Sequence, residues 1–263
     1  MDSLVLLAFI LTGILEIAIP LILGFLAVKK LNVSWKVFGF GSLFFVLVQI
    51  IHVPLVIFTQ PVLSGFLAAN YGKIAIVFVL AVYLGLLAGL FEEITRWLVL
   101  KYFFARQKIK LNKNNALMFG LGWAGIESAL VGILVLLSML SYVSITSMDE
   151  TQIQDVYGSQ LNETQMSQLK EQRNALLNLN PFDVLIGLLE RIMTIGVHLA
   201  FTFLVFTGIV SGRKIYLVLA VFFHSLLDFL AVYVSSLYGI LPTEGIALVF
   251  ALASLYYVRK QFK

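Results

Sequence analysis

The sequence predicts an all-α protein, a polytopic transmembrane helical bundle of about seven spans. Of its 263 residues, 60% are hydrophobic and only 12% are charged, and the mean hydropathy is +0.99. A soluble domain of this length does not need so much apolar surface, so lipid must be the solvent for most of the chain. Because lipid offers no partner for backbone N–H and C=O groups, apolar runs that cross it must be helices.

Apolar runs long enough to cross a hydrocarbon core of about 30 Å recur along the chain. In chain order they cover residues 4–28, 38–58, 74–100, 116–140, 182–210, 215–238 and 245–258. The first run opens with Asp2 where a signal peptide has a basic region, and it is longer than a signal-peptide core. We therefore interpret it as a retained span. The last run is the shortest.

Basic residues in the connecting segments predict the orientation, because basic loops stay on the cytoplasmic side of a membrane. With seven spans, one side holds the larger basic set: Lys29, Lys30, Lys36, Lys101, Arg106, Lys108, Lys110, Lys113, Arg213, Lys214, Arg259, Lys260 and Lys263. The other side holds Lys73, Lys170 and Arg173. We expect the N-terminus outside and the C-terminus inside. An external reporter signal from a fusion at Lys263 would overturn this orientation.

Residues 1–263 are expected to form a single membrane domain, with a polar external loop over residues 141–180. Apolar residues among polar neighbours predict a short helix near residues 163–177 of this loop. Asn180 and Pro181 are typical of a helix start and mark the next span. Cysteine is absent, which excludes disulfides, thiolate zinc sites and cysteine nucleophiles. The loop lysines and arginines that raise the pI to about 9.2 suit a cytoplasmic membrane face, and we expect no nucleic-acid partner.

Ionisable residues inside the predicted spans are the best guide to function. Each costs several kcal/mol at membrane depth, about 2.5–3.5 kcal/mol on insertion scales, unless it is paired or hydrated. The candidate site residues are Glu92, Glu93, Arg96, Glu127, His198, His224 and Asp228. For Glu16, Gln49 and His52, in the first two spans, we expect local helix contacts.

Helical spacing predicts that these side chains face a common interior. Gly85, Gly89 and Glu93 recur every four residues, which puts Glu93 on a face where another helix can approach closely. Glu92 and Arg96 have the spacing of an intrahelical ion pair. Asp228 lies one turn from His224, where it could accept an imidazole N–H. At 1.5 Å per residue, five of the candidates lie about 10–20 Å from the cytoplasmic ends of their spans: Glu93, Glu127, His198, His224 and Asp228.

Carboxylates and imidazoles at one depth allow three classes of function. A carboxylate can take a proton from water while histidine N–H groups hold the developing oxyanion, as peptide hydrolysis requires. The same groups could ligate a divalent metal. In a transporter they would instead form a proton or cation relay, and in a scaffold they would bind membrane segments of partners without catalysis.

The order of the motifs resembles that of a known protease group. Glu92-Glu93-x-x-Arg96 precedes a histidine in a later span, and His224-x-x-x-Asp228 follows in the next. This order resembles the glutamate-type intramembrane proteases related to type II CAAX prenyl endopeptidases, and more distantly the PrsW-type proteases. Within them the chain looks most like the YhfC family. The segments that look particularly similar to that family are Gly125-Ile126-Glu127 and Glu190-Arg191 with His198.

The resemblance implies an intramembrane endopeptidase, a hydrolase acting on membrane-protein or lipidated peptide substrates. It implies that Glu92 or Glu93 activates water, while His198, His224 and Asp228 bind and polarise the substrate carbonyl and the water. It also implies either no cofactor or one divalent metal such as zinc, which His198 and His224 would hold. Membrane lipid is the other expected partner. The expected location is the cytoplasmic membrane of a prokaryote.

The sequence departs from the CAAX-type pattern in three places. That pattern is Glu-Glu-x-x-x-Arg, whereas one residue fewer separates Glu93 from Arg96 here. Thr194 stands where an aromatic residue precedes the histidine, and Asp228 stands where asparagine is common. The shortened spacing leaves open which of the two glutamates is the base.

Overall fold

The computed structural model describes residues 2–263, and over these residues it is helical without strands. Within this range seven helices are long and apolar enough to cross a membrane, as predicted. They are α1 (Ser3–Leu31), α2 (Trp35–Asn70), α3 (Lys73–Leu98) with its continuation, α5 (Lys113–Ser147), α8 (Pro181–Ser211), α9 (Ile215–Tyr238) and α10 (Ile240–Gln261). α3 continues through a π-helix, η1 (Val99–Phe103), into α4 (Phe104–Arg106).

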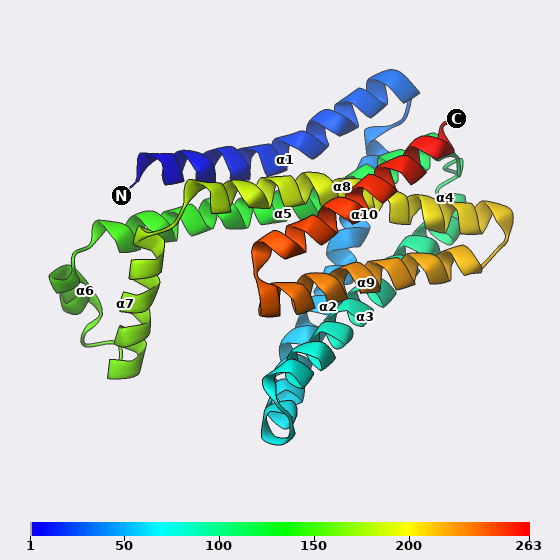
Figure 1. Ribbon diagram of the computed structural model, residues 1–263. Helices are drawn as coiled ribbons and strands as arrows, with labels where there is room; N and C mark the ends of the chain where they lie inside the picture. Colours follow the sequence, from blue (N-terminus) through cyan, green and yellow to red (C-terminus); the bar gives the residue numbers. More distant parts are fainter. Residues whose placement is uncertain (1) are drawn as a thin grey trace. The chain divides into compact units, whose positions relative to one another are not determined.

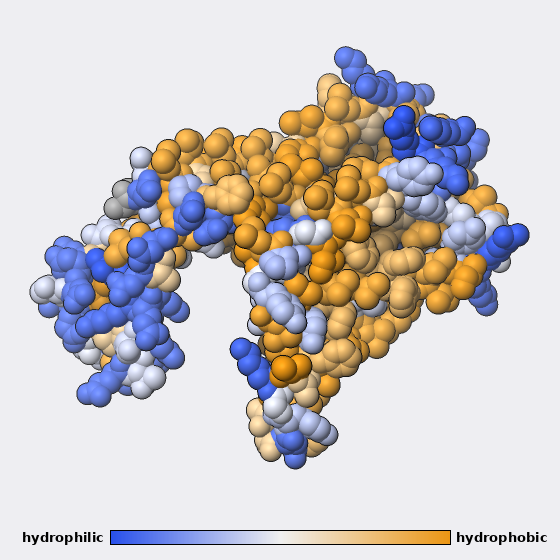
Figure 2. Space-filling view, viewed as in Figure 1, coloured by the Kyte–Doolittle hydropathy of each residue, from blue (hydrophilic) through white to orange (hydrophobic). Residues whose placement is uncertain are grey.

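The outer faces of these helices are apolar, the reverse of a soluble protein. Figure 2 shows hydrophobic side chains over most of the surface of the long helices. Phe58 is 76% exposed and Val62 is 74% exposed. Apolar side chains this exposed need lipid around them, and the chain is therefore an integral membrane protein. The predicted direction of its termini stays a prediction.

The chain divides into two compact units. The smaller contains the residues up to Ile19 together with Ser128–Arg191, and its core gathers around Val5, Phe9 and Tyr142. It includes the short helices α6 (Glu150–Tyr157) and α7 (Glu163–Leu177), which Figure 2 shows as hydrophilic.

The ends of the helices in the smaller unit follow their sequence signals. α6 and α7 each begin with a capping box, and α7 confirms the helix predicted near residues 163–177. α8 begins at Pro181, as predicted, and the Asn180 carboxamide oxygen accepts a hydrogen bond from the Phe182 N–H at 2.9 Å. The external position of residues 141–180 stays a prediction.

The larger unit contains Pro20–Glu127 and Ile192–Lys263. In it α3 and α9 lie side by side (Figure 1). Their backbones meet at glycines: a Cβ atom at Gly85 would lie only 2.5 Å from the carbonyl oxygen of Ser225. Gly89 faces the same stretch of α9. The repeat of small residues therefore brings α9 against α3 on the side that carries Glu93.

A π-helical turn at Val99–Phe103, which begins three residues after Arg96, was not predicted from the sequence. Such turns occur as single insertions in α-helices, frequently at functional sites. The ring of Phe103, the last residue of the turn, packs edge-on against Phe40 and Phe44 of α2, with ring centroids 4.9 and 4.8 Å apart. The turn fixes this end of α3 to α2.

Candidate active site

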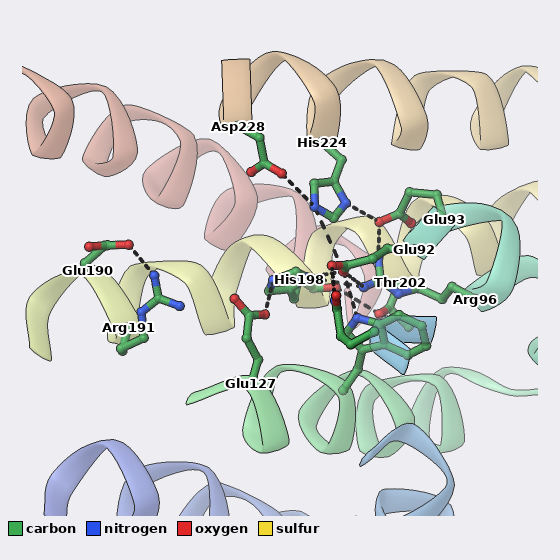
Figure 3. A network of polar contacts seen from close by, with 12 residues as sticks. Glu92, Glu93, Arg96, Glu127, Glu190, Arg191, His198, Thr202, His224 and Asp228 are labelled. Carbon is green, nitrogen blue, oxygen red and sulfur yellow. Dashed lines mark hydrogen bonds and ion pairs between the residues drawn. The ribbon is translucent and has the colours of Figure 1, made fainter. Parts of the chain in front are cut away.

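The candidate site lies inside the larger unit, where α3, α5, α8 and α9 each contribute polar side chains (Figure 3). Glu93 and Arg96 are completely buried, and Glu92, His198 and His224 are nearly so. Charged groups this deep must be paired or hydrogen-bonded to be tolerated. Hydrogen bonds and ion pairs within and between the helices supply these partners.

Glu93 is held from two sides. Its Oε1 accepts hydrogen bonds from Arg96 Nη1 and, at 2.7 Å, from His224 Nδ1. Since an ionised carboxylate can only accept, His224 carries its proton on Nδ1. When the ring is neutral, its Nε2 presents a lone pair to the remainder of the site.

His198 has the opposite tautomer. Its Nδ1 lies 3.2 Å from Arg96 Nη2, and a guanidinium can only donate, so Nδ1 is the acceptor. The proton is then on Nε2, which lies 2.6 Å from Glu127 Oε2. Both ring nitrogens of His198 are therefore engaged. Thr202 additionally donates to the backbone carbonyl of His198 at 2.9 Å.

Glu92 lies at the centre of the cluster. Its Oε1 accepts from Gln49 Nε2 at 3.1 Å, and its Oε2 accepts from the indole N–H of Trp123 at 3.0 Å. Oε2 also lies 4.0 Å from His198 Nδ1 and 4.0 Å from His224 Nε2. These two distances are longer than a hydrogen bond.

The predicted ion pair between Glu92 and Arg96 is present but long, with Oε2 and Nη2 3.8 Å apart. The shorter contact of Arg96 is with Glu93. The Arg96 guanidinium also lies over the indole ring of Trp123, 4.6 Å from the ring centroid. Arg96 thus holds Glu93 in place, whereas the hydrogen bonds to Glu92 come from the neutral side chains of Gln49 and Trp123.

Asp228 differs from the expectation that it accepts an N–H from His224. Its Oδ2 lies 3.6 Å from His224 Nε2, too far for a hydrogen bond. The physical reason is that the other ring nitrogen, Nδ1, carries the proton and donates it in a hydrogen bond to Glu93. Asp228 is less buried than its neighbours, with 35% of its side chain exposed.

The residues fit a divalent metal in the kind of donor they offer. His224 Nε2 has a lone pair that faces Asp228 Oδ2 and Glu92 Oε2, and Glu93 supports the ring from behind, an arrangement typical of metal-bound histidines. His198, which was also a predicted ligand, has no free ring nitrogen in this arrangement. Within residues 2–263, no three His, Asp or Glu side chains stand as close together as metal ligands do. Binding an ion would therefore draw these donors together.

The structure brings all seven candidate residues into one network, and their catalytic roles stay predictions. Sequence reasoning missed Trp123, for which the only signal was an indole N–H inside a span. It also expected only local contacts for Gln49, which in fact reaches Glu92 on another helix. His52 does make the expected local contact, with Gln49. In the smaller unit, Glu190 forms an ion pair with its neighbour Arg191.

Comparisons with known proteins identify the family of the chain. The profile of a family described as "YhfC intramembrane metalloprotease" matches residues 15–251. The "Uncharacterized membrane protein YhfC" of Bacillus subtilis (strain 168) is 27% identical over 224 residues, which cover 84% of this chain and 82% of that protein. No solved structure matches the chain significantly. The family description supports a membrane-protease role and is compatible with a divalent metal. The extent of the profile match shows that the chain belongs to the YhfC intramembrane metalloprotease family.

Proposed function

We propose that this protein is an intramembrane endopeptidase in which Glu92 is the base that activates water. The observation that carries the proposal is the place of Glu92 Oε2, 4.0 Å from His224 Nε2. A water molecule to one side of the line between the two atoms would lie about 2.8 Å from each and could bridge them. Glu93 is unsuited to this role because Arg96 and His224 already occupy one of its oxygens and its side chain is completely buried.

In the proposed reaction, the water oxygen attacks the carbonyl carbon of the scissile peptide bond while Glu92 takes the water proton. The imidazole N–H of His198, whose Nε2 lies 2.6 Å from Glu127 Oε2, turns to the carbonyl oxygen as negative charge develops there. When the C–N bond breaks, Glu92 returns the proton to the leaving amine. Glu93 and Arg96 are positioning residues, because they hold the His224 and His198 rings.

A divalent metal such as zinc, when bound, would make a water molecule more acidic and polarise the substrate carbonyl. His224 Nε2 and Asp228 Oδ2 would hold it, 3.6 Å apart in the structure. Glu92 would remain beside this pair as the proton acceptor. The substrates we propose are membrane-protein or lipidated peptides, reached from the lipid of a prokaryotic cytoplasmic membrane.

The test is proteolysis by the purified protein reconstituted in liposomes with a library of single-span peptides, with products identified by mass spectrometry. Glu92→Gln keeps the size of the side chain and removes the base. Its one oxygen can still accept from Trp123, and the Gln49 carboxamide can turn over so that its oxygen accepts from the new NH₂ group. We expect cleavage to fall by about 10²–10⁴-fold. Glu190→Gln, a glutamate outside the cluster, is the matched control and should cleave normally.

Two results would contradict the proposal. Wild-type activity in Glu92→Gln would remove Glu92 as the base. Absence of cleavage by the wild type, together with proton or cation flux across the same liposomes, would instead support a transporter built on this cluster.

A further inference from the structure

A cavity of about 350 Å³ lies between α2, α3 and α9, next to the candidate active site. Most of its lining is aliphatic, and the two polar side chains in it are His52 and Asp228. Asp228 belongs to the catalytic cluster, so the cavity is continuous with the proposed site. Ile57, which also lines the cavity, is 60% exposed on the apolar surface of the helices. The cavity therefore connects the lipid-facing surface with the candidate active site.

The hydrogen-bond network determines what His52 can offer in this cavity. Glu92 can only accept, so Gln49 turns its NH₂ group toward Glu92 and its carbonyl oxygen toward His52. The Nδ1 atom of His52, 3.1 Å from that oxygen, must then donate and carry the ring proton. This leaves Nε2 of the neutral ring as an acceptor.

That acceptor has no hydrogen-bond partner among the residues that the structure describes, although it is buried. A buried polar atom without a partner costs about 1–3 kcal/mol. The ring cannot easily turn away, because it stacks on Phe91 with ring centroids 5.5 Å apart. A ligand that brings an N–H group into the cavity and displaces a neighbouring aliphatic side chain of the lining would remove this penalty.

We propose that this cavity receives the substrate peptide from the lipid, with His52 Nε2 accepting a backbone N–H and the aliphatic lining holding a substrate side chain. A segment unwound for cleavage has backbone N–H groups that lipid cannot satisfy, and a lipid acyl chain has none. The occupant is therefore a membrane-embedded peptide with an aliphatic residue close to the scissile bond. This inference rests on the proposed protease function and identifies its binding pocket.

Photo-crosslinking tests occupancy without requiring cleavage. Val56, in the cavity wall, is replaced by benzoylphenylalanine, and the protein is illuminated in liposomes with the single-span peptide library. The same replacement at Ala253, an exposed position on α10, is the control. We expect peptide adducts several-fold more abundant at position 56 than at position 253. Adducts with lipid alone, or equal peptide labelling at both positions, would overturn the proposal.

Narrowing the cavity tests specificity. Ala88→Leu and Ala231→Leu add bulk to the cavity wall, whereas Ala69→Leu adds the same bulk at an exposed position of α2. Relative to small residues, we expect the two cavity variants to disfavour leucine and phenylalanine beside the scissile bond by at least about tenfold. The Ala69 variant should keep the wild-type preference. Unchanged preferences in both cavity variants would overturn the proposal.

His52→Phe keeps a ring that can stack on Phe91 but removes the acceptor. We expect KM to rise by about tenfold while kcat changes little, because the contact is made before and during the reaction. An unchanged KM would overturn the role of His52. Peptide adducts at position 56 without any wild-type cleavage would contradict the protease function alone, and cleavage without such adducts would contradict the pocket alone.

Discussion

The close approach of α3 and α9 at Gly85 gives the sharpest prediction. In Gly85→Ala, the new Cβ would lie 2.5 Å from the Ser225 carbonyl oxygen and 2.8 Å from the Phe229 nitrogen. Ordinary contact begins at 3.4 Å, so the two backbones must separate by about 0.9 Å. The hydrogen bond between Glu93 and His224, now 2.7 Å, would lengthen to about 3.6 Å and break.

A displacement of about 1 Å in a catalytic group typically costs about 10²-fold in rate, so kcat/KM should fall about 100-fold. Stability should fall by about 1–3 kcal/mol, as for other overpacked contacts. Peptide cleavage in liposomes and thermal unfolding in detergent measure the two effects. Gly65→Ala is the control, because nothing lies within 4 Å of a Cβ there. It should leave activity unchanged and stabilise α2 by up to about 1 kcal/mol.

Full activity in Gly85→Ala would refute the reasoning. It would mean either that the helices accommodate the methyl group without separating, or that the contact between Glu93 and His224 does not matter for the reaction.

Three other predictions follow from the buried groups. Trp123→Phe removes the indole N–H that donates to Glu92 at 3.0 Å. A hydrogen bond to a charged group contributes about 1.5–3 kcal/mol, so kcat/KM should fall roughly 10–100-fold. Unchanged kinetics would count against Glu92 as the base. Glu16→Met should raise the unfolding temperature, because within residues 2–263 neither buried carboxylate oxygen of Glu16 has a hydrogen-bond partner; a lower temperature would contradict this. Exhaustive chelation should abolish cleavage and zinc should restore it, because His224 and Asp228 offer suitable donors; activity that survives chelation would exclude a required metal.

Most of the fold could be predicted from the sequence, because lipid requires long apolar helices and tolerates little else. The ends of the helices were harder to predict. α2 continues to Asn70, well beyond the predicted end at residue 58, and contains Pro54 and Pro61. α10 begins at Ile240 and not near residue 245. Hydropathy marks the part of a helix that lies in hydrocarbon, whereas a helix can continue beyond the apolar run.

The members of the candidate site were predictable, but their pairings were not. Spacing along each helix placed Glu93 beside glycines and Asp228 one turn from His224. Spacing along a helix could not show that Glu93 accepts a hydrogen bond from His224, because this contact joins residues 131 positions apart. The hydrogen bonds from Gln49 and Trp123 to Glu92 likewise depend on how three helices meet. Sequence spacing carries no information about such distances.

The π-helical turn at Val99–Phe103 has a consequence for how this protein can evolve. It accommodates one residue more than a regular turn, so the chain after it is rotated by about 100° relative to an unbroken α-helix. Phe103 is thereby brought against Phe40 and Phe44, while Glu92, Glu93 and Arg96 keep the direction set by the preceding turns. Deleting one residue so that the turn becomes a regular α-helical turn would rotate Phe103 away from Phe40 and Phe44 and leave Glu92, Glu93 and Arg96 in place. The turn separates variation at the end of α3 from the residues that must stay in place.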